Sequence, residues 1–129
     1  MTSFNSFIRG SWQVLSDLRP TENYEDKVIL SDAAVRMWRA FDVVFVHVSV
    51  LISFTPNAPS QIPYVDLVLP GPPAEFPVRV PIFLTNVKYG EKYFNSTMLE
   101  MTGTTLRVYN MPFDSATKYE MNAQFFYSP

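Results

Sequence analysis

The sequence predicts an all-β protein, an antiparallel β-sandwich of jelly-roll-like or barrel-like type. Two observations predict this class: apolar residues alternate with other residues in several short segments, and loops rich in Pro, Gly, Asn and Ser separate these segments at intervals of about ten residues. No segment has the sustained period of a long amphipathic helix. A chain of 129 residues without cysteine is long enough to bury a core without disulfides or metals, and it excludes thiol chemistry and zinc–thiolate sites.

The segment from Asp42 to Phe54 is the strand around which the others are expected to assemble. Because side chains alternate across a strand, its even positions all point to one side, which we expect to be the core. All of these positions are apolar: Val44, Val46, Val48, Val50, Ile52 and Phe54. The odd positions mix apolar and polar groups, which suits a face that is partly covered or that meets another subunit. A strand of this length would run about 40 Å, so we also expect a bend or bulge within it.

The sequence before this strand contains an N-terminal arm and residues 31–41, the segment that leads into the strand. Residues 1–27 have apolar content without a clean period, and they are expected to form an N-terminal arm that drapes over the main body or packs on a neighbouring subunit. Residues 28–129 then form the sandwich domain. Within them, 31–41 is ambiguous, because Ser31 or Asp32 could cap a helix and the following residues favour one. The alternative is a strand leading into Asp42, which the resemblance described below favours and which we adopt.

Two strands are expected after the central one. Residues 64–69 alternate, with Asp66 pointing outward. Residues 76–85 place four apolar side chains on one face, but Pro77 and Pro81 have no amide hydrogen to donate to a neighbouring strand. Such a segment belongs at the edge of a sheet, so an edge strand is predicted there.

The C-terminal third is expected to contain a hairpin and a closing strand. Residues 86–92 resemble a turn around Gly90, and residues 98–109 predict a hairpin centred on Gly103. Residues 118–127 show the cleanest apolar and polar alternation in the chain.

Charge and composition limit the classes of partner that the protein is expected to bind. Ten basic and twelve acidic residues are scattered along the chain without a basic run, so nucleic acid is not an expected partner. Charged residues are 17% of the chain and aromatic residues 16%, which implies an unusually apolar surface or one partly buried in an assembly; we expect the latter. The longest apolar run, residues 43–51, is too short and too interrupted to span a bilayer, so no membrane insertion is expected. No targeting segment is visible.

The sequence carries no catalytic or metal-binding signature. His47 is the only histidine, and Ser49 is its only near neighbour on the same face of a strand, which favours a half-buried histidine or one at a subunit contact. Nothing singles out two of the twelve carboxylates as an acid and base for glycoside hydrolysis. There is no phosphate-binding loop, nucleophile elbow or calcium loop. We therefore expect no enzyme, no cofactor and no metal.

Aromatic residues are the more promising candidates for binding. Tyrosine and tryptophan offer flat apolar faces with a polar group, a combination that both sugar rings and protein partners use. Tyr89 and Tyr93 flank the expected turn at Gly90, so we select them as candidate ligand-binding residues. Core packing is the alternative for most of the set, which comprises Trp12, Trp38, Tyr24, Tyr64, Tyr89, Tyr93 and Tyr109.

A fixed order of features extends over nearly the whole chain. In sequence order they are Trp12, Ala34-Val35-Arg36, the apolar segment 43–54, Leu69-Pro70, the segment 98–109 with Gly103, and the aromatic segment 119–127. This order resembles the small trimeric β-sandwich heads and accessory domains of bacteriophage tail fibres and related receptor-binding proteins. Where that family commonly has a glycine turn before the long strand, this chain has Arg39-Ala40-Phe41-Asp42. That difference keeps the helix alternative for 31–41 open.

The resemblance implies a homotrimeric structural protein of a virion, a fibre head or receptor-binding domain that attaches the virion to a host-surface saccharide or protein. Its partners would be copies of itself, other virion proteins and the host receptor, and no binding residue is transferred by the resemblance. Two alternatives remain. One is a capsid or decoration protein that stabilises a virion by subunit packing, and the other is a lectin-like carbohydrate-binding module or small carbohydrate-active enzyme that acts alone.

Overall fold

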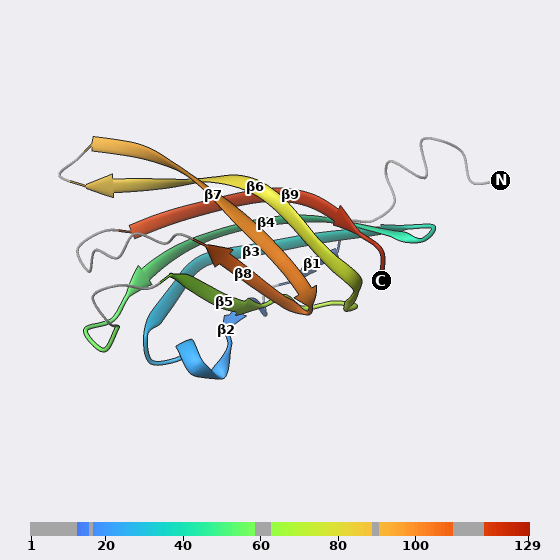
Figure 1. The fold of residues 1–129 in the computed structure, drawn as a ribbon, viewed down its shortest axis with the longest axis horizontal. Coiled ribbons are helices and arrows are strands. Elements are labelled where there is room, and N and C mark those ends of the chain that lie inside the picture. Colours follow the sequence, from blue (N-terminus) through green and yellow to red (C-terminus); the bar gives the residue numbers. More distant parts are fainter. Residues whose placement is uncertain (1–12, 16, 59–62, 89–90, 110–117) are drawn as a thin grey trace.

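The protein folds into one continuous antiparallel sheet. The computed structural model describes residues 13–15, 17–58, 63–88, 91–109 and 118–129 (Figure 1). Over these residues the sheet has nine strands in the order β1-β3-β4-β9-β6-β7-β8-β5-β2. The strands are β1 (Gln13–Leu15), β2 (Arg19–Pro20), β3 (Val28–Ala40), β4 (Val43–Phe54), β5 (Tyr64–Val68), β6 (Ala74–Lys88), β7 (Glu91–Gly103), β8 (Thr105–Tyr109) and β9 (Lys118–Tyr127).

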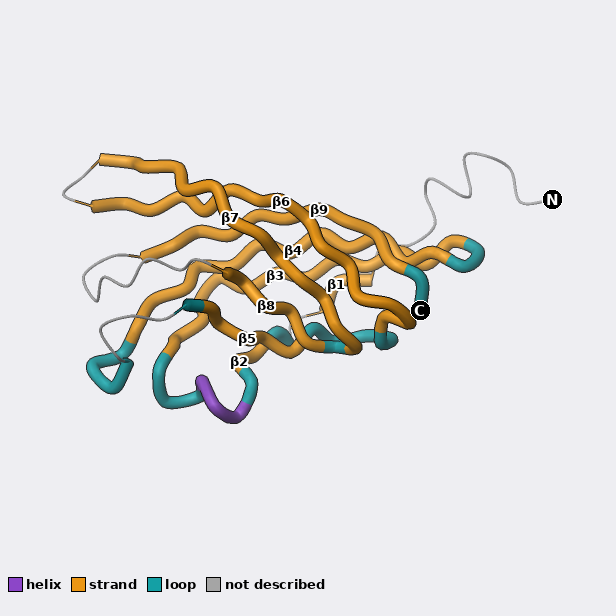
Figure 2. The backbone as a smooth tube through the Cα atoms, viewed as in Figure 1, coloured by secondary structure: helices purple, strands orange, loops and turns teal. Residues whose placement is uncertain are grey.

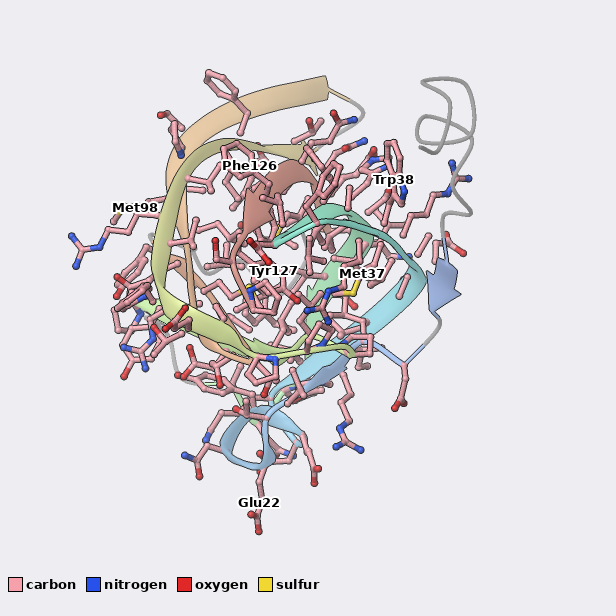
Figure 3. All side chains as sticks on the ribbon, turned by 90° about the vertical axis from the view of Figure 1, so that its right-hand side faces the viewer. Glu22, Met37, Trp38, Met98, Phe126 and Tyr127 are labelled. Atoms are coloured by element: carbon pink, nitrogen blue, oxygen red, sulfur yellow. The ribbon has the colours of Figure 1, made fainter. Side chains whose placement is uncertain are left out.

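The sheet curls into a nearly closed, barrel-like shell (Figures 1 and 2). β2, at one end of the strand order, lies against β3, which is next to the other end, and this contact brings the two margins of the sheet together. Figure 3 shows Met37 and Tyr127 inside the curve of the sheet, whereas Glu22 projects away from it. The predicted all-β antiparallel class is therefore confirmed.

β4 is the central strand of one half of the shell. It pairs with β3 from Val43 to Phe54 and with β9 from Val44 to Ile52. Its burial alternates without interruption, so that every even position is buried and every odd position is partly exposed, as predicted. Burying a valine or isoleucine side chain stabilises a fold by about 1.5–3 kcal/mol. The inward row of β4 is consequently a large part of the core.

Residues 31–40 belong to β3 and Phe41 to the turn that follows it, which confirms the strand and removes the helix alternative. Helix propensity is overridden because β3 pairs with β4 on one side and with β1 on the other, and because Val35 and Met37 reach the core. The expected irregularity of the long strand lies in β3 rather than β4: Ser31 pairs with Leu51 but Ala34 with Ser49, which leaves one extra residue on β3.

The hairpin between β3 and β4 is present although its turn contains no glycine. Ala40 pairs with Val43, so that Phe41 and Asp42 form a two-residue loop. Phe41 has a φ of 57°, in the left-handed region that favours glycine. The turn therefore forms with a residue that is intrinsically disfavoured there.

β6 is not at the edge of the sheet, so that prediction is wrong. It lies between β9 and β7 in the strand order. The prolines are nevertheless compatible with this position in the sheet. β6 pairs with β9 only over Leu84–Val87, beyond Pro77 and Pro81, so neither proline has to donate a hydrogen bond to β9. The first half of β6 has β7 as its one ladder partner and thus behaves locally as an edge.

Two of the three C-terminal predictions are confirmed, whereas residues 86–88 and 91–92 of the expected turn belong to β6 and β7. β7 and β8 form the hairpin around Gly103, whose φ is 59°, with Thr102 paired to Thr105. β9 alternates between exposed and buried residues along its whole length.

The described part of the predicted N-terminal arm, residues 13–15 and 17–27, packs on the same shell. β1 extends the sheet beside β3, β2 pairs with β5, and Leu18 between them is buried in the core. A single 3₁₀ turn, η1 (Glu22–Tyr24), follows β2. No helix in the described segments is long and apolar enough to cross a membrane.

The turn at Gly71 yields the first testable prediction. Gly71 has a φ of 118°, and a Cβ placed there would lie 2.6 Å from the Met37 sulfur, whereas Gly103 has open space around it. Both backbones are strained for alanine, by about 1–3 kcal/mol, but only Gly71→Ala also displaces a buried side chain. Gly71→Ala is expected to lower the free energy of unfolding by more than Gly103→Ala does, as measured by urea titration. Equal losses in the two variants would contradict the contact with Met37.

Candidate functional site

A row of opposite charges crosses four strands on the outer face of β5, β8, β7 and β6. The residues are direct cross-strand partners in the order Asp66, Arg107, Glu100 and Arg79. Arg107 donates two hydrogen bonds to Asp66, from Nε to Oδ1 at 2.8 Å and from Nη2 to Oδ2 at 3.0 Å. Arg79 Nε donates to Glu100 Oε2 at 2.7 Å. Two carboxylates and two guanidinium groups therefore balance in formal charge.

Three tyrosines surround this row at its β5 and β8 end. The Arg107 guanidinium lies 3.8 Å from the centroid of the Tyr64 ring, close enough for a cation–π contact. The Tyr64 ring is 6.0 Å from Tyr109 and 6.4 Å from Tyr24, which η1 supplies. We name Tyr24, Tyr64, Asp66, Glu100, Arg107 and Tyr109 the tyrosine–arginine face.

The ionisation of this face follows from its contacts. Hydrogen bonds from Arg79 and Tyr109 lower the pKa of Glu100, and hydrogen bonding with Asp66 raises the pKa of Arg107. Burial and the nearby Asp66 carboxylate raise the pKa of Tyr24, so its hydroxyl stays protonated at neutral pH. A carboxylate held ionised in this way is a poor general acid, because protonating a leaving group requires a raised pKa.

A second surface lies on the outer side of β3, β4 and β9. Trp38, Phe45 and Phe126 are consecutive cross-strand partners, with ring centroids 5.8 Å and 6.0 Å apart. Figure 3 shows Trp38 on the outer side of the shell. Phe45 and Phe126 line a hollow of about 740 Å³ together with His47 and Arg36. We name this hollow the aromatic hollow.

A second hollow adjoins the first, between β6 and β9. Its volume is about 600 Å³, and Phe76, Val78 and Val80 of β6 line it opposite Phe125 and Phe126 of β9. We name it the β6–β9 slit. Gln124, Phe125 and Phe126 line both hollows, so the two form one continuous surface, the Phe126 surface.

His47 is half-buried on the outer face of β4, as the sequence predicts. Its Nε2 lies 2.9 Å from the Asn122 Oδ1 on β9, with which it shares a hydrogen bond. Among the residues that the structure describes, no three His, Asp or Glu side chains are grouped so that they could hold a metal ion.

The two tyrosines selected from the sequence fall, in whole or in their side chains, outside the residues that the structure describes. Tyr89 lies outside the described residues. Tyr93 belongs to β7 and pairs with Asn86, but its side chain is likewise outside the description. Their binding role therefore stays a prediction.

The tyrosine–arginine face was missed because it joins strands that are distant in sequence. Asp66 and Arg107 are 41 positions apart, and each alone resembles an ordinary solvated charge at an outward position. The available signal was that both occur between two apolar inward neighbours and close to a tyrosine, Tyr64 and Tyr109. Only the pairing of β5 with β8 places these four residues together.

Comparison of the chain with protein-family models, with curated proteins and with solved structures found no match.

The lowered pKa of Glu100 yields the second prediction. When a carboxyl group has a lower pKa in the folded state, its stabilisation is present above its unfolded pKa of about 4.3 and is lost as the pH falls through the folded pKa. Wild-type protein is therefore expected to be more stable than Glu100→Gln at pH 7, with a difference in unfolding free energy that shrinks below about pH 4.

The measurement is urea unfolding of both proteins from pH 7 to pH 3. Glu22→Gln, which removes an exposed carboxylate at η1, is the matched control for loss of one negative charge. A difference between wild type and Glu100→Gln that stays constant with pH would show that Arg79 and Tyr109 do not favour the ionised carboxylate.

Proposed function

We propose that this protein is a non-enzymatic structural protein of a virion, a fibre head or receptor-binding domain that attaches to a saccharide or protein on the host surface. Attachment uses the tyrosine–arginine face, repeated around the axis of a homotrimer. The proposal is supported by the all-β fold, by the order of sequence features and by the chemistry of this face.

The tyrosine–arginine face is the observation that carries the proposal. The apolar faces of sugar rings pack on aromatic side chains, and their hydroxyls hydrogen-bond to carboxylates and guanidinium groups. Tyr24, Tyr64 and Tyr109 supply the first kind of contact, and the row containing Asp66 and Arg107 supplies the second. Because the charges of the row balance, an uncharged saccharide suits it better than an acidic one.

The rigidity of this face also favours binding. Arg107 is held by two hydrogen bonds to Asp66 and by the Tyr64 ring, and Tyr109 donates a hydrogen bond to Glu100 at 3.2 Å. Side chains that are already ordered lose little conformational entropy when a ligand binds. Weak contacts at each subunit, repeated around a symmetry axis, then combine into useful avidity.

The Phe126 surface favours a second candidate, a capsid or decoration protein that stabilises a virion by subunit packing. Exposed aromatic residues gathered on one sheet face are typical of protein–protein contacts. A lectin-like module or small carbohydrate-active enzyme acting alone would instead be a monomer with the tyrosine–arginine face as its site.

The third prediction tests attachment on a glycan array. Wild-type protein is expected to bind one class of uncharged glycan, and Tyr64→Ala is expected to weaken this binding about tenfold or more, because it removes the ring at the centre of the face. Tyr89→Ala and Tyr93→Ala test the two residues selected from the sequence.

Phe83→Ala is the control, because Phe83 is an aromatic residue, 66% exposed on β6, that lies outside the tyrosine–arginine face. Circular dichroism checks that each variant is folded. Glycan binding that survives Tyr64→Ala unchanged would contradict the assignment of this face, and absence of any glycan binding would favour the decoration protein.

A further inference from the structure

We propose that the Phe126 surface is the contact between copies of this chain, with Phe126 of one copy seated in the β6–β9 slit of the next. The inference rests on the self-association in the proposed function and names the surface that produces it. The partner is a second copy of the same chain.

The slit exists because two strands separate. β9 continues its pairing with β4 as far as Tyr127, and β6 continues its pairing with β7 back to Ala74, but the ladder between β6 and β9 ends at Leu84 and Met121. Beyond the gap, the Glu75 amide donates to the Ser128 carbonyl at 2.8 Å and ties the two strands together again. The opening is thus a defined feature of the sheet, bounded at both ends.

The slit exposes side chains that the rest of the shell would bury. Val78 and Val80 point inward on β6 yet remain only partly buried, next to the core residue Phe125. At its rim, Phe76 is 68% exposed and Phe126 is 63% exposed. Large exposed aromatic rings beside an apolar hollow form the kind of patch that marks a protein–protein contact.

The position of Phe126 indicates that the partner is another copy. A projecting ring and a hollow that can receive a ring occur on the same surface, so each copy around a three-fold axis can place its Phe126 in the slit of the next copy and receive a Phe126 in its own slit. Because Phe126 lines the slit of its own chain, the ring that a copy donates and the slit in which it receives a ring are adjacent, which brings the Phe126 residues of the three copies close to the symmetry axis.

The charges near the slit permit this contact. Arg79 is the one formally charged residue among those that line it, and Glu100 already neutralises it at 2.7 Å. Bringing two slits together therefore does not oppose unpaired like charges. Gln124 and Ser128 complete the polar part of the rim with side chains that can donate and accept hydrogen bonds.

The fourth prediction is that Phe126→Asp prevents self-association. Sedimentation velocity is expected to show an assembly for the wild type and a protomer for the variant, with the dissociation constant raised about thirtyfold or more, because a carboxylate would have to enter an apolar hollow. Phe83→Asp is the matched control, since Phe83 is equally exposed on β6 but does not line the slit. It is expected to assemble like the wild type.

A cysteine variant tests the same contact by forming a covalent bond between copies instead of by disrupting the assembly. The chain has no cysteine, so a single introduced thiol can form a disulfide only between copies. Phe126→Cys is expected to form a covalent dimer under mild oxidation because Phe126 lies near the axis, whereas Phe83→Cys stays monomeric on a non-reducing gel.

Wild-type protein that sediments as a protomer at high concentration would overturn the inference, and so would assembly that Phe126→Asp leaves intact. The proposed attachment is judged separately, by titrating soluble oligosaccharide into Phe126→Asp. Unchanged affinity per site in this protomer would preserve the tyrosine–arginine face as a receptor site, whether or not the Phe126 surface mediates assembly.

Discussion

The structure depends on the removal of one row of apolar side chains from water. The inward residues of β4 are the middle of the core, and β4 is paired on both sides along most of its length. Because a slip of one residue in either pairing would turn an entire row to the opposite face, the burial of this row sets the register of β3 and β9. The outward positions of those strands, including Trp38 and Phe126, follow from the same constraint.

Alternation across the sheet produces two outer surfaces with different chemistry. On β5, β8, β7 and β6, the outward residues form a charge-balanced row beside tyrosines, in which every charged group has an opposite partner. On β3, β4 and β9, the outward residues form a row of aromatic rings. The first surface suits a hydrated ligand and the second a dry contact, so the proposed attachment and the proposed self-association would use different surfaces of one small shell, which meet at Arg79.

The prolines of β6 connect local backbone chemistry to the shape of the second surface. Pro77 and Pro81 cannot donate hydrogen bonds to a neighbouring strand, and β6 separates from β9 over the half of its length that contains them. The separation leaves partly buried valines at an opening in the shell. An edge-like segment inside a sheet is a liability that proteins usually cover, and a neighbouring copy would cover it here.

The sequence alone determined the class of fold and much of its detail. Period-two alternation identified the central strand, its inward row, the hairpin at Gly103 and the closing strand, because burial on one face of a strand is encoded by neighbouring residues. Helix propensity favoured the wrong element in residues 31–41, since pairing with β1 and β4 decides that segment. The two prolines of β6 led to the wrong prediction that it is an edge strand. Proline restricts hydrogen bonding locally but does not reveal how far two strands remain paired.

Tertiary structure decided everything that depends on which strands are neighbours. The tyrosine–arginine face joins residues from η1, β5, β7 and β8, and no pattern along the chain records that Asp66 faces Arg107. The Phe126 surface likewise requires β9 to lie between β4 and β6. Alternation specifies the side of the sheet to which a residue points, whereas its cross-strand partner is set by strand order and register, which are properties of the whole chain.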